Sequence, residues 1–222
     1  MYDVLIPKAY FVKLLENLAA IVEEQKDYLT HLDAQIGDSD HGVNLSIGFR
    51  EVMKKLPDLV AQDVDIATLL KKSGMSLLSR VGGASGPLYG SLFMKLGAPV
   101  AGKNEVTFAE LCEMIKSGID AVVSRGKAEL GDKTMVDALL PARDALFAGM
   151  EEGLKPLDVM EKAVAAAEAG RDSVVDKVAK KGRAMRLGER AIGHVDPGTA
   201  SSCLFLRVFT DTLKEFVPCL SS

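Results

Sequence analysis

Several residue types that define common classes of protein are scarce in this 222-residue sequence, which has three cysteines, three histidines and no tryptophan. The cysteines are odd in number and widely spaced, at Cys112, Cys203 and Cys219. This pattern fits neither a disulfide framework nor a zinc site, so we expect reduced, partly buried thiols. No apolar run reaches the roughly 20 residues of a membrane-spanning helix. Residues 1–18 carry charges among their apolar positions, unlike a secretion signal, and we expect a cytoplasmic protein without membrane contact.

The sequence also lacks a concentration of positive charge. Its 27 Lys and Arg residues stand against 31 Asp and Glu residues, for a formal net charge of −4, and no Lys/Arg-rich tract occurs. Bulk attraction to nucleic acid is therefore excluded, and any anion must be held by a local arrangement of residues. The apolar content of 48% supplies an ordinary core. No linker or low-complexity stretch divides the chain, so we expect one domain over residues 1–222.

Apolar residues at helical spacing occur in nearly every segment, whereas alternating, strand-like stretches are almost absent. We predict an all-α protein. The expected helices are eight, near residues 7–32, 43–55, 65–80, 87–97, 107–125, 134–149, 157–181 and 198–216. Because short connections favour antiparallel neighbours, the simplest architecture is an up-and-down bundle or closed helical barrel.

The connections between these helices fall into two kinds. The odd-numbered ones contain DAQIGDSDHG, VGGASG, GKAELGDK and GRAMRLGERAIGHVDPG, which are rich in glycine and charge. The even-numbered ones, LPDLVAQDVD, GAPVAGKNEV and EEGLKP, are ordinary connectors. In an up-and-down bundle all odd connections lie at the same end. The topology therefore predicts one composite site at one rim of the bundle.

The first odd connection gathers three aspartates, Asp33, Asp38 and Asp40. Neighbouring carboxylates raise one another's pKa unless a cation neutralises them. Carboxylate oxygens suit Mg²⁺, which usually binds through a few aspartates together with substrate phosphates. The local alternative is that Asp40 caps the following helix and Asp38 forms an Asx turn. An EF-hand is excluded, because the pattern lacks the glycine at position 6 and the distal glutamate.

Two glycine-rich connections could present backbone N–H groups to an anion. GGASG (82–86) opens a helix, where free N–H groups and the helix dipole favour a phosphate, and Ser85 adds a hydroxyl donor. The alternative is that these glycines only form a tight turn. GKAELGDKT (126–134) is one residue away from a P-loop motif. We reject a P-loop, because Asp132 intrudes before Lys133 and the preceding segment is helical instead of a strand.

The last odd connection ends in GHVDPGTASS (193–202), which has the form of a helix start. Asp196 suits the N-cap and Pro197 the first helical position. Basic residues precede this start, namely Arg183, Arg186, Arg190 and His194. They would face the acidic and glycine-rich connections, as expected of a nucleotide site, although solvated surface charge is the better explanation of any single arginine.

Four motifs, DAQIGDSDHGVNL, GGASGPLYG, RGKAELGDKTMVDAL and LGERAIGHVDPGTASS, follow one another across almost the whole chain. Together they closely resemble the nucleotide-binding L subunit of dihydroxyacetone kinase. The resemblance implies an eight-helix antiparallel barrel that holds ADP or ATP and two Mg²⁺ ions at one rim, with Asp33, Asp38 and Asp40 as metal ligands. The nucleotide-binding residues that it implies are His41, Gly42, Val43, Asn44, Ala84, Ser85, Gly126, Met135, Arg183, Asp196, Pro197 and Gly198.

The resemblance further implies a division of labour between subunits. A separate K subunit holds dihydroxyacetone covalently through a histidine, so this chain would position and neutralise the phosphates without a catalytic residue of its own. In many relatives the M subunit of a phosphotransferase system recharges the bound ADP from a phosphohistidine, whereas fused forms use free ATP. A free-standing chain favours the first arrangement, and a homodimer is left open. Met185 and Arg186 depart from the family's usual small-aromatic pair.

Three other functions stay open at this point. The acceptor could be another small ketose, because its contacts belong to the partner. The second is a non-catalytic nucleotide-binding adaptor that regulates a partner, since a binding site can be retained after catalytic activity is lost. The third is a helical magnesium-diphosphate enzyme of the prenyl-transfer kind, but its paired aspartate-rich helical motifs are missing. The intact aspartates of the first connection favour activity.

Overall fold

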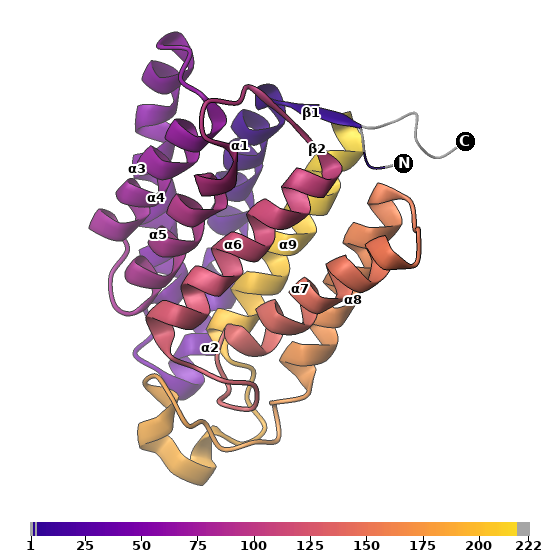
Figure 1. Cartoon of the computed structure of the whole chain (residues 1–222). Helices are drawn as coiled ribbons and strands as arrows, with labels where there is room; N and C mark the ends of the chain where they lie inside the picture. The colour runs from indigo at the N-terminus through magenta and orange to yellow at the C-terminus, as the bar shows by residue number, and fades with distance from the viewer. Residues whose placement is uncertain (1, 3, 217–222) are drawn as a thin grey trace.

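The computed structural model describes residue 2 and residues 4–216, and in this part of the chain nine α-helices pack side by side (Figure 1). The α-helices are α1 (Lys8–Glu24), α2 (Lys26–Ile36), α3 (His41–Ala61), α4 (Ile66–Arg80), α5 (Ser85–Leu96), α6 (Phe108–Gly126), α7 (Val136–Glu151), α8 (Pro156–Asp172) and α9 (Pro197–Phe216). The remaining elements are the 3₁₀ segments η1 (Ala98–Val100) and η2 (Ala184–Ala191) and the strands β1 (Leu5–Pro7) and β2 (Glu105–Thr107). The all-α prediction is confirmed.

Three of the expected helices differ from the observed ones. The helix expected over 43–55 continues to Ala61 as α3, with Pro57 inside it. The helix expected over 7–32 is divided at Gln25, whose φ of −93° and ψ of 8° leave the helical region. The chain bends there without a loop, because Gln25 N–H still donates to the Ile21 carbonyl and its own carbonyl accepts from Leu29 N–H. The helix expected over 157–181 ends at Asp172 as α8, and the chain continues as irregular turns. The two short strands, which pair antiparallel with Leu5 opposite Thr107, were not expected.

A continuous apolar core joins the helices, and aromatic side chains link three of them. Phe205 of α9 lies 5.5 Å from Phe49 of α3 and 4.9 Å from Tyr89 of α5, measured between ring centroids. Pairs of this kind add about 0.5–1.5 kcal/mol beyond the burial of their area. Because α3, α5 and α9 all begin at the same end of the molecule, this packing also fixes the relative positions of their N-termini.

The α2–α3 junction is held by a close backbone approach at Gly42. A Cβ on this residue would lie 2.0 Å from the Lys26 carbonyl oxygen of α2, so no larger residue fits. The first turn of α3 therefore lies directly against α2.

The antiparallel arrangement places the predicted connections as expected. The α2–α3, α4–α5, α6–α7 and α8–α9 connections lie at one end of the helices, the lower end in Figure 1, where η2 projects below the bundle. Cys112 and Cys203 are buried and form no disulfide, whereas Cys219 lies outside the described residues. Among the described helices, none combines the length and apolar character needed to cross a membrane.

Candidate functional site

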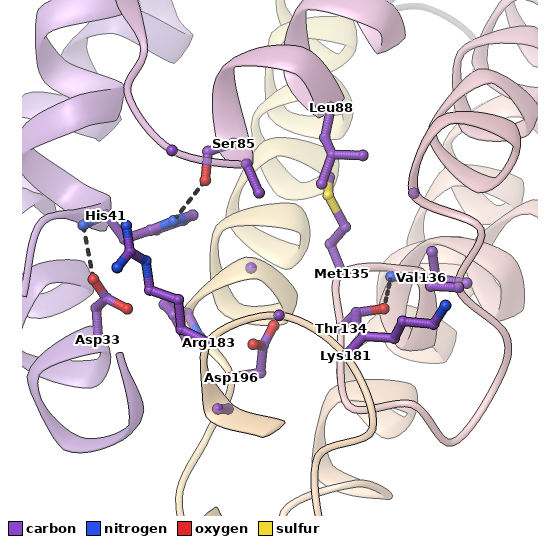
Figure 2. Close-up of a pocket in the computed structure, with 18 of the residues that line it drawn as sticks. Asp33, His41, Ser85, Leu88, Thr134, Met135, Val136, Lys181, Arg183 and Asp196 are labelled. Carbon is purple, nitrogen blue, oxygen red and sulfur yellow. Dashed lines mark hydrogen bonds between the residues drawn. The ribbon is translucent and has the colours of Figure 1, made fainter. Parts of the chain in front are cut away.

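A cavity of about 510 Å³ opens at this end of the bundle, and all four of these connections contribute to its wall. The α2–α3 and α4–α5 connections face the α6–α7 and α8–α9 connections across it (Figure 2). The lining residues from the four connections include Asp38, Asp40, Gly82, Gly83, Ala84, Ala128, Lys133, Thr134, Met135, Lys181, Gly182, Arg183 and Asp196. The rim site predicted from the odd and even connections is thus present as a cavity.

Most of the residues that the sequence assigned to a nucleotide or metal line this cavity. They are Asp33, Asp38, Asp40, His41, Ala84, Ser85, Gly126, Met135, Arg183, Asp196, Pro197 and Gly198. Three others lie outside the lining. Gly42 packs against α2, Val43 is exposed at 41% of its surface, and Asn44 has its side-chain amide beside Gly82. In this structure Asn44 therefore supports the glycine-rich connection from behind.

The three aspartates of the first connection form one cluster, with a carboxylate oxygen from each lying within 4.8 Å of the others. Asp33 accepts hydrogen bonds through Oδ2 from the backbone N–H groups of Asp40, at 2.8 Å, and His41, at 3.1 Å. Asp33 therefore caps α3. Asp40 occupies the N-cap position but its side chain makes no capping bond, so the suggestion that Asp40 caps this helix is wrong.

Asp38 lies in an electrostatic environment that disfavours its negative charge. Partial burial raises the pKa of its carboxyl, and the neighbouring Asp40 and Asp33 raise it further, while the Arg183 guanidinium opposes them. Arg183 Nη2 lies 2.8 Å from Asp38 Oδ2 in a salt bridge across the mouth of the cavity. A donor set made only of carboxylate oxygens under mutual repulsion suits a hard divalent cation such as Mg²⁺.

His41 joins the aspartate cluster to the glycine-rich connection. Its Nδ1 lies 3.1 Å from Ser85 Oγ (Figure 2) and its Nε2 lies 2.9 Å from Ser201 Oγ of α9. Burial lowers the pKa of His41 to about 4, although Asp33 and Asp40 act in the opposite direction. The imidazole is therefore neutral at physiological pH, and it links three helix N-termini without adding charge to the cavity.

The α4–α5 connection brings backbone N–H groups to the cavity. Gly83 has a φ of 64°, in the left-handed region that favours glycine, and this turn aims the start of α5 at the cavity. The first turn of α5 contains Ser85 and Pro87, and the proline has no backbone N–H that would need a partner. The free N–H groups and the dipole of α5 make this helix start a favourable place for a phosphate.

The α6–α7 connection does not work as a P-loop, as the sequence analysis concluded. Lys133 is 1% exposed, and its ammonium donates to the carbonyl oxygens of Val175 at 2.7 Å, Lys177 at 3.1 Å and Ala191 at 2.6 Å. These three carbonyls lie at the two ends of the segment that carries Arg183. Lys133 therefore ties that segment to the bundle, a structural role that its position in a P-loop-like motif did not reveal.

Asp196 caps α9 as predicted, since its Oδ2 accepts from Thr199 N–H at 2.8 Å. Burial raises the pKa of this carboxyl to about 7, and the nearby Asp137 raises it further, while the backbone N–H groups of Thr199 and Gly198 and the Lys133 ammonium lower it. Asp196 thus lies on the cavity wall in an environment that disfavours its negative charge.

One wall of the cavity is apolar, and of the residues that form it only Met135 was predicted to line the site. Leu88 of α5 and Met135 lie close together above the cavity in Figure 2, and Ile36, Val122 and Val136 also line it. Apolar side chains at helical spacing look like core residues in the sequence, so only the fold reveals that these face a cavity. Met185, at the departure from the family pattern, is 53% exposed and is not among the lining residues.

Comparison with known proteins agrees with this geometry. A family model described as the DAK2 domain matches residues 35–211. The chain belongs to the DAK2 family. It is 55% identical to "PEP-dependent dihydroxyacetone kinase 2, ADP-binding subunit DhaL" of Listeria innocua, over 98% of this chain and 100% of the relative. It is 41% identical to the corresponding ADP-binding subunit DhaL of Escherichia coli K12, over 95% of this chain and 99% of the relative.

The DAK2 fold is also found in solved structures. The native dihydroxyacetone kinase of C. freundii matches with a TM-score of 0.70 and 26% identity, over 92% of this chain. This chain spans 34% of that longer kinase. The same kinase in complex with AMP-PNP and Mg²⁺ matches with a TM-score of 0.67 and 26% identity, over 90% of this chain and 33% of the kinase. The relatives of this chain are thus kinases or kinase subunits, which are phosphotransferases.

Proposed function

We propose that this chain is the nucleotide- and magnesium-binding subunit of a dihydroxyacetone kinase and that ADP or ATP occupies the rim cavity. The observation that carries this proposal is the meeting, in one cavity, of a three-carboxylate cluster, the N-terminus of α5 and an apolar wall. The metal would bind at the carboxylates, the phosphates at the start of α5 and the base at the apolar wall. The names of the L. innocua and E. coli relatives as ADP-binding subunits support the same assignment.

In this proposal Asp33, Asp38 and Asp40 would hold two Mg²⁺ ions, which supply the positive charge that phosphoryl transfer requires. The backbone N–H groups of Ala84 and Ser85 would bind phosphate oxygens at the start of α5. Arg183, which lines the same cavity, adds a positive charge beside Asp38 of the cluster. The chain's contribution to the reaction is then to position the phosphates and exclude water.

The base would lie against the apolar wall of the cavity. Leu88 and Met135 offer a polarizable surface there. Gly126 at the end of α6 leaves the space beside Leu88 free, because a Cβ on it would lie 3.3 Å from Leu88 Cδ2. A wall of this kind suits a flat aromatic ring, whereas the carboxylates and the helix start suit the charged end. The full set of proposed nucleotide-binding residues is the one given by the sequence analysis.

The acceptor is proposed to come from a separate K subunit. A covalent bond to a ketone needs an accessible nucleophilic imidazole, but His41 is 7% exposed and hydrogen-bonded at both ring nitrogens. His194 is hydrogen-bonded to Gln35 at 3.3 Å. We further propose that bound ADP is recharged by the M subunit of a phosphotransferase system in the cytoplasm, as the name of the Lactococcus lactis relative, a PTS-dependent kinase subunit, suggests.

Thermal unfolding in the presence of ADP, Mg²⁺ or both tests the shared site. A ligand that binds only the folded state stabilises it by mass action, so nucleotide and metal that share phosphates should reinforce each other. We expect the shift in melting temperature with both ligands to exceed the sum of the two separate shifts. Strictly additive shifts would show that the aspartate cluster and the glycine-rich connection do not form one site.

A further inference from the structure

A continuous chain of hydrogen bonds runs from the core to the cavity through four side chains. Tyr89 OH lies 2.6 Å from Ser201 Oγ, Ser201 Oγ lies 2.9 Å from His41 Nε2, and His41 Nδ1 lies 3.1 Å from Ser85 Oγ. Tyr89 is 1% exposed and Ser201 is fully buried, so neither exchanges these partners for water. Only Ser85 and His41 had been assigned to the nucleotide.

The donor-to-acceptor direction of this series of hydrogen bonds follows from the number of hydrogens that each group can donate. A phenol is a stronger acid than an alcohol and therefore the better donor, so Tyr89 donates across the 2.6 Å contact to Ser201. Ser201 has one hydrogen of its own and two acceptors in reach, His41 Nε2 at 2.9 Å and the Gly198 carbonyl at 3.2 Å. The imidazole nitrogen is the nearer of the two, and the carbonyl also accepts from Ser202 at 2.8 Å, so we take His41 Nε2 as the acceptor from Ser201.

This direction decides which ring nitrogen of His41 carries a hydrogen. A neutral imidazole has one N–H group, so a hydrogen bond accepted at Nε2 places the hydrogen on Nδ1. Nδ1–H then donates to Ser85 Oγ. Among the described residues, the hydroxyl hydrogen of Ser85 then has no other acceptor and is free for a ligand. In the opposite direction, Ser85 would donate to Nδ1 and could offer the cavity only a lone pair.

We propose that Tyr89 and Ser201 are positioning residues, which hold His41 as the Nδ1–H tautomer and thereby leave the Ser85 hydroxyl to donate to a nucleotide phosphate. The role in binding rests on the proposed function, whereas the tautomer does not. Hydrogen bonds aligned in one direction polarise one another in a buried setting, so a hydroxyl removed at Tyr89 weakens the donor at the cavity. Tyr89, which also lines the cavity, therefore affects phosphate binding through this hydrogen-bond chain.

Nitrogen-15 NMR of the histidine rings tests the tautomer directly in the nucleotide-free and magnesium-free protein at pH 8. We expect a pyrrole-type signal for His41 Nδ1 and a pyridine-type signal for Nε2. Tyr89→Phe should shift this pattern towards the other tautomer. Tyr10→Phe is the matched control, because Tyr10 is an equally buried tyrosine whose hydroxyl donates to the Phe209 carbonyl, remote from His41 in the hydrogen-bond network.

Calorimetric titration with ADP and Mg²⁺ gives the second readout. Loss of one hydrogen bond in the chain should raise the Kd about threefold to tenfold in Tyr89→Phe and in Ser201→Ala, and leave it unchanged in Tyr10→Phe. Circular dichroism verifies that each variant is folded.

Two results would overturn the proposal. One is an Nε2–H signal for His41 in the wild-type protein, which decides the matter even when a variant fails to fold. The other is a Tyr89→Phe protein with an unchanged tautomer and an unchanged Kd. A wild-type protein that has the expected tautomer but binds no nucleotide would instead contradict the proposed function, so the two failures are distinguishable.

Discussion

Replacement of Asp38 by asparagine separates the proposed metal-binding role of the aspartate cluster from its contribution to folding. Asp38 lies in a connection, and its described ion pair is with Arg183, whose side chain is 56% exposed. Exposed ion pairs contribute about 0–1 kcal/mol to the free energy of unfolding. For a chain of this size, that corresponds to a loss of at most about 4 °C in melting temperature. The ligand-free variant should therefore unfold close to the wild type.

The effect on ligand binding should be much larger. At a nucleotide concentration of 100 times the Kd, binding stabilises the folded wild type by about 2.7 kcal/mol, or roughly 5–11 °C in melting temperature. Asparagine at position 38 removes one negative charge and one metal-ligating oxygen. We expect the magnesium-dependent part of this shift to disappear, and phosphoryl transfer with partner subunits to fall below detection.

The assay is a set of thermal melts with ADP alone and with ADP and Mg²⁺, accompanied by turnover measurements. Asp58→Asn is the matched control, because Asp58 is an exposed aspartate near the opposite end of α3. The control should behave as the wild type in every condition. If Asp38→Asn keeps the full magnesium-dependent shift and near-normal turnover, Asp38 is not a metal ligand and the reasoning from the cluster fails.

Two further predictions concern the residues around the cavity. Lys133→Met should lower the free energy of unfolding by about 1–3 kcal/mol and speed hydrogen exchange in residues 173–193, because three carbonyls lose their hydrogen-bond donor. The control variant Lys180→Met, at an exposed lysine, should have neither effect. Equal exchange rates in both variants would show that Lys133 does not hold this segment to the bundle. The pKa of Asp196 is about 7 in the folded state and about 3.9 in the unfolded state. Between these two values the folded state binds one proton more than the unfolded state, so this group makes the wild type less stable as the pH rises from about 4 to 7. Urea unfolding should therefore show Asp196→Asn gaining stability over the wild type between pH 5 and pH 7.5, and parallel profiles would contradict the raised pKa.

The position of the site could be predicted because it depends on topology more than on detail. Helical periodicity located the bundle, and the contrast between the two sets of connections placed the charged and glycine-rich ones at one rim. Capping chemistry was also readable where a residue caps its own helix, as Asp196 does at α9. In each case the signal lies within a few residues of the feature that it predicts.

Features that depend on contacts between residues far apart in the sequence could not be predicted in this way. Asp33 caps α3 from the preceding helix, so the nearer Asp40 was the natural but wrong candidate. Lys133 bonds to carbonyls more than 40 residues away, and no local pattern records that. The division at Gln25 leaves no glycine or proline signal, because the backbone hydrogen bonds continue almost without interruption through the bend.

The central claim, that this chain supplies the nucleotide site and a partner supplies the acceptor, is tested most directly by a pair of reactions. The chain is mixed with ATP, Mg²⁺ and dihydroxyacetone, and a cognate K subunit is added to one of two parallel tubes. We expect dihydroxyacetone phosphate only in the tube that contains the K subunit, because transfer requires an acceptor held in line with the γ-phosphate. Comparable product in both tubes would mean that this chain binds the acceptor itself, contrary to the two-subunit account.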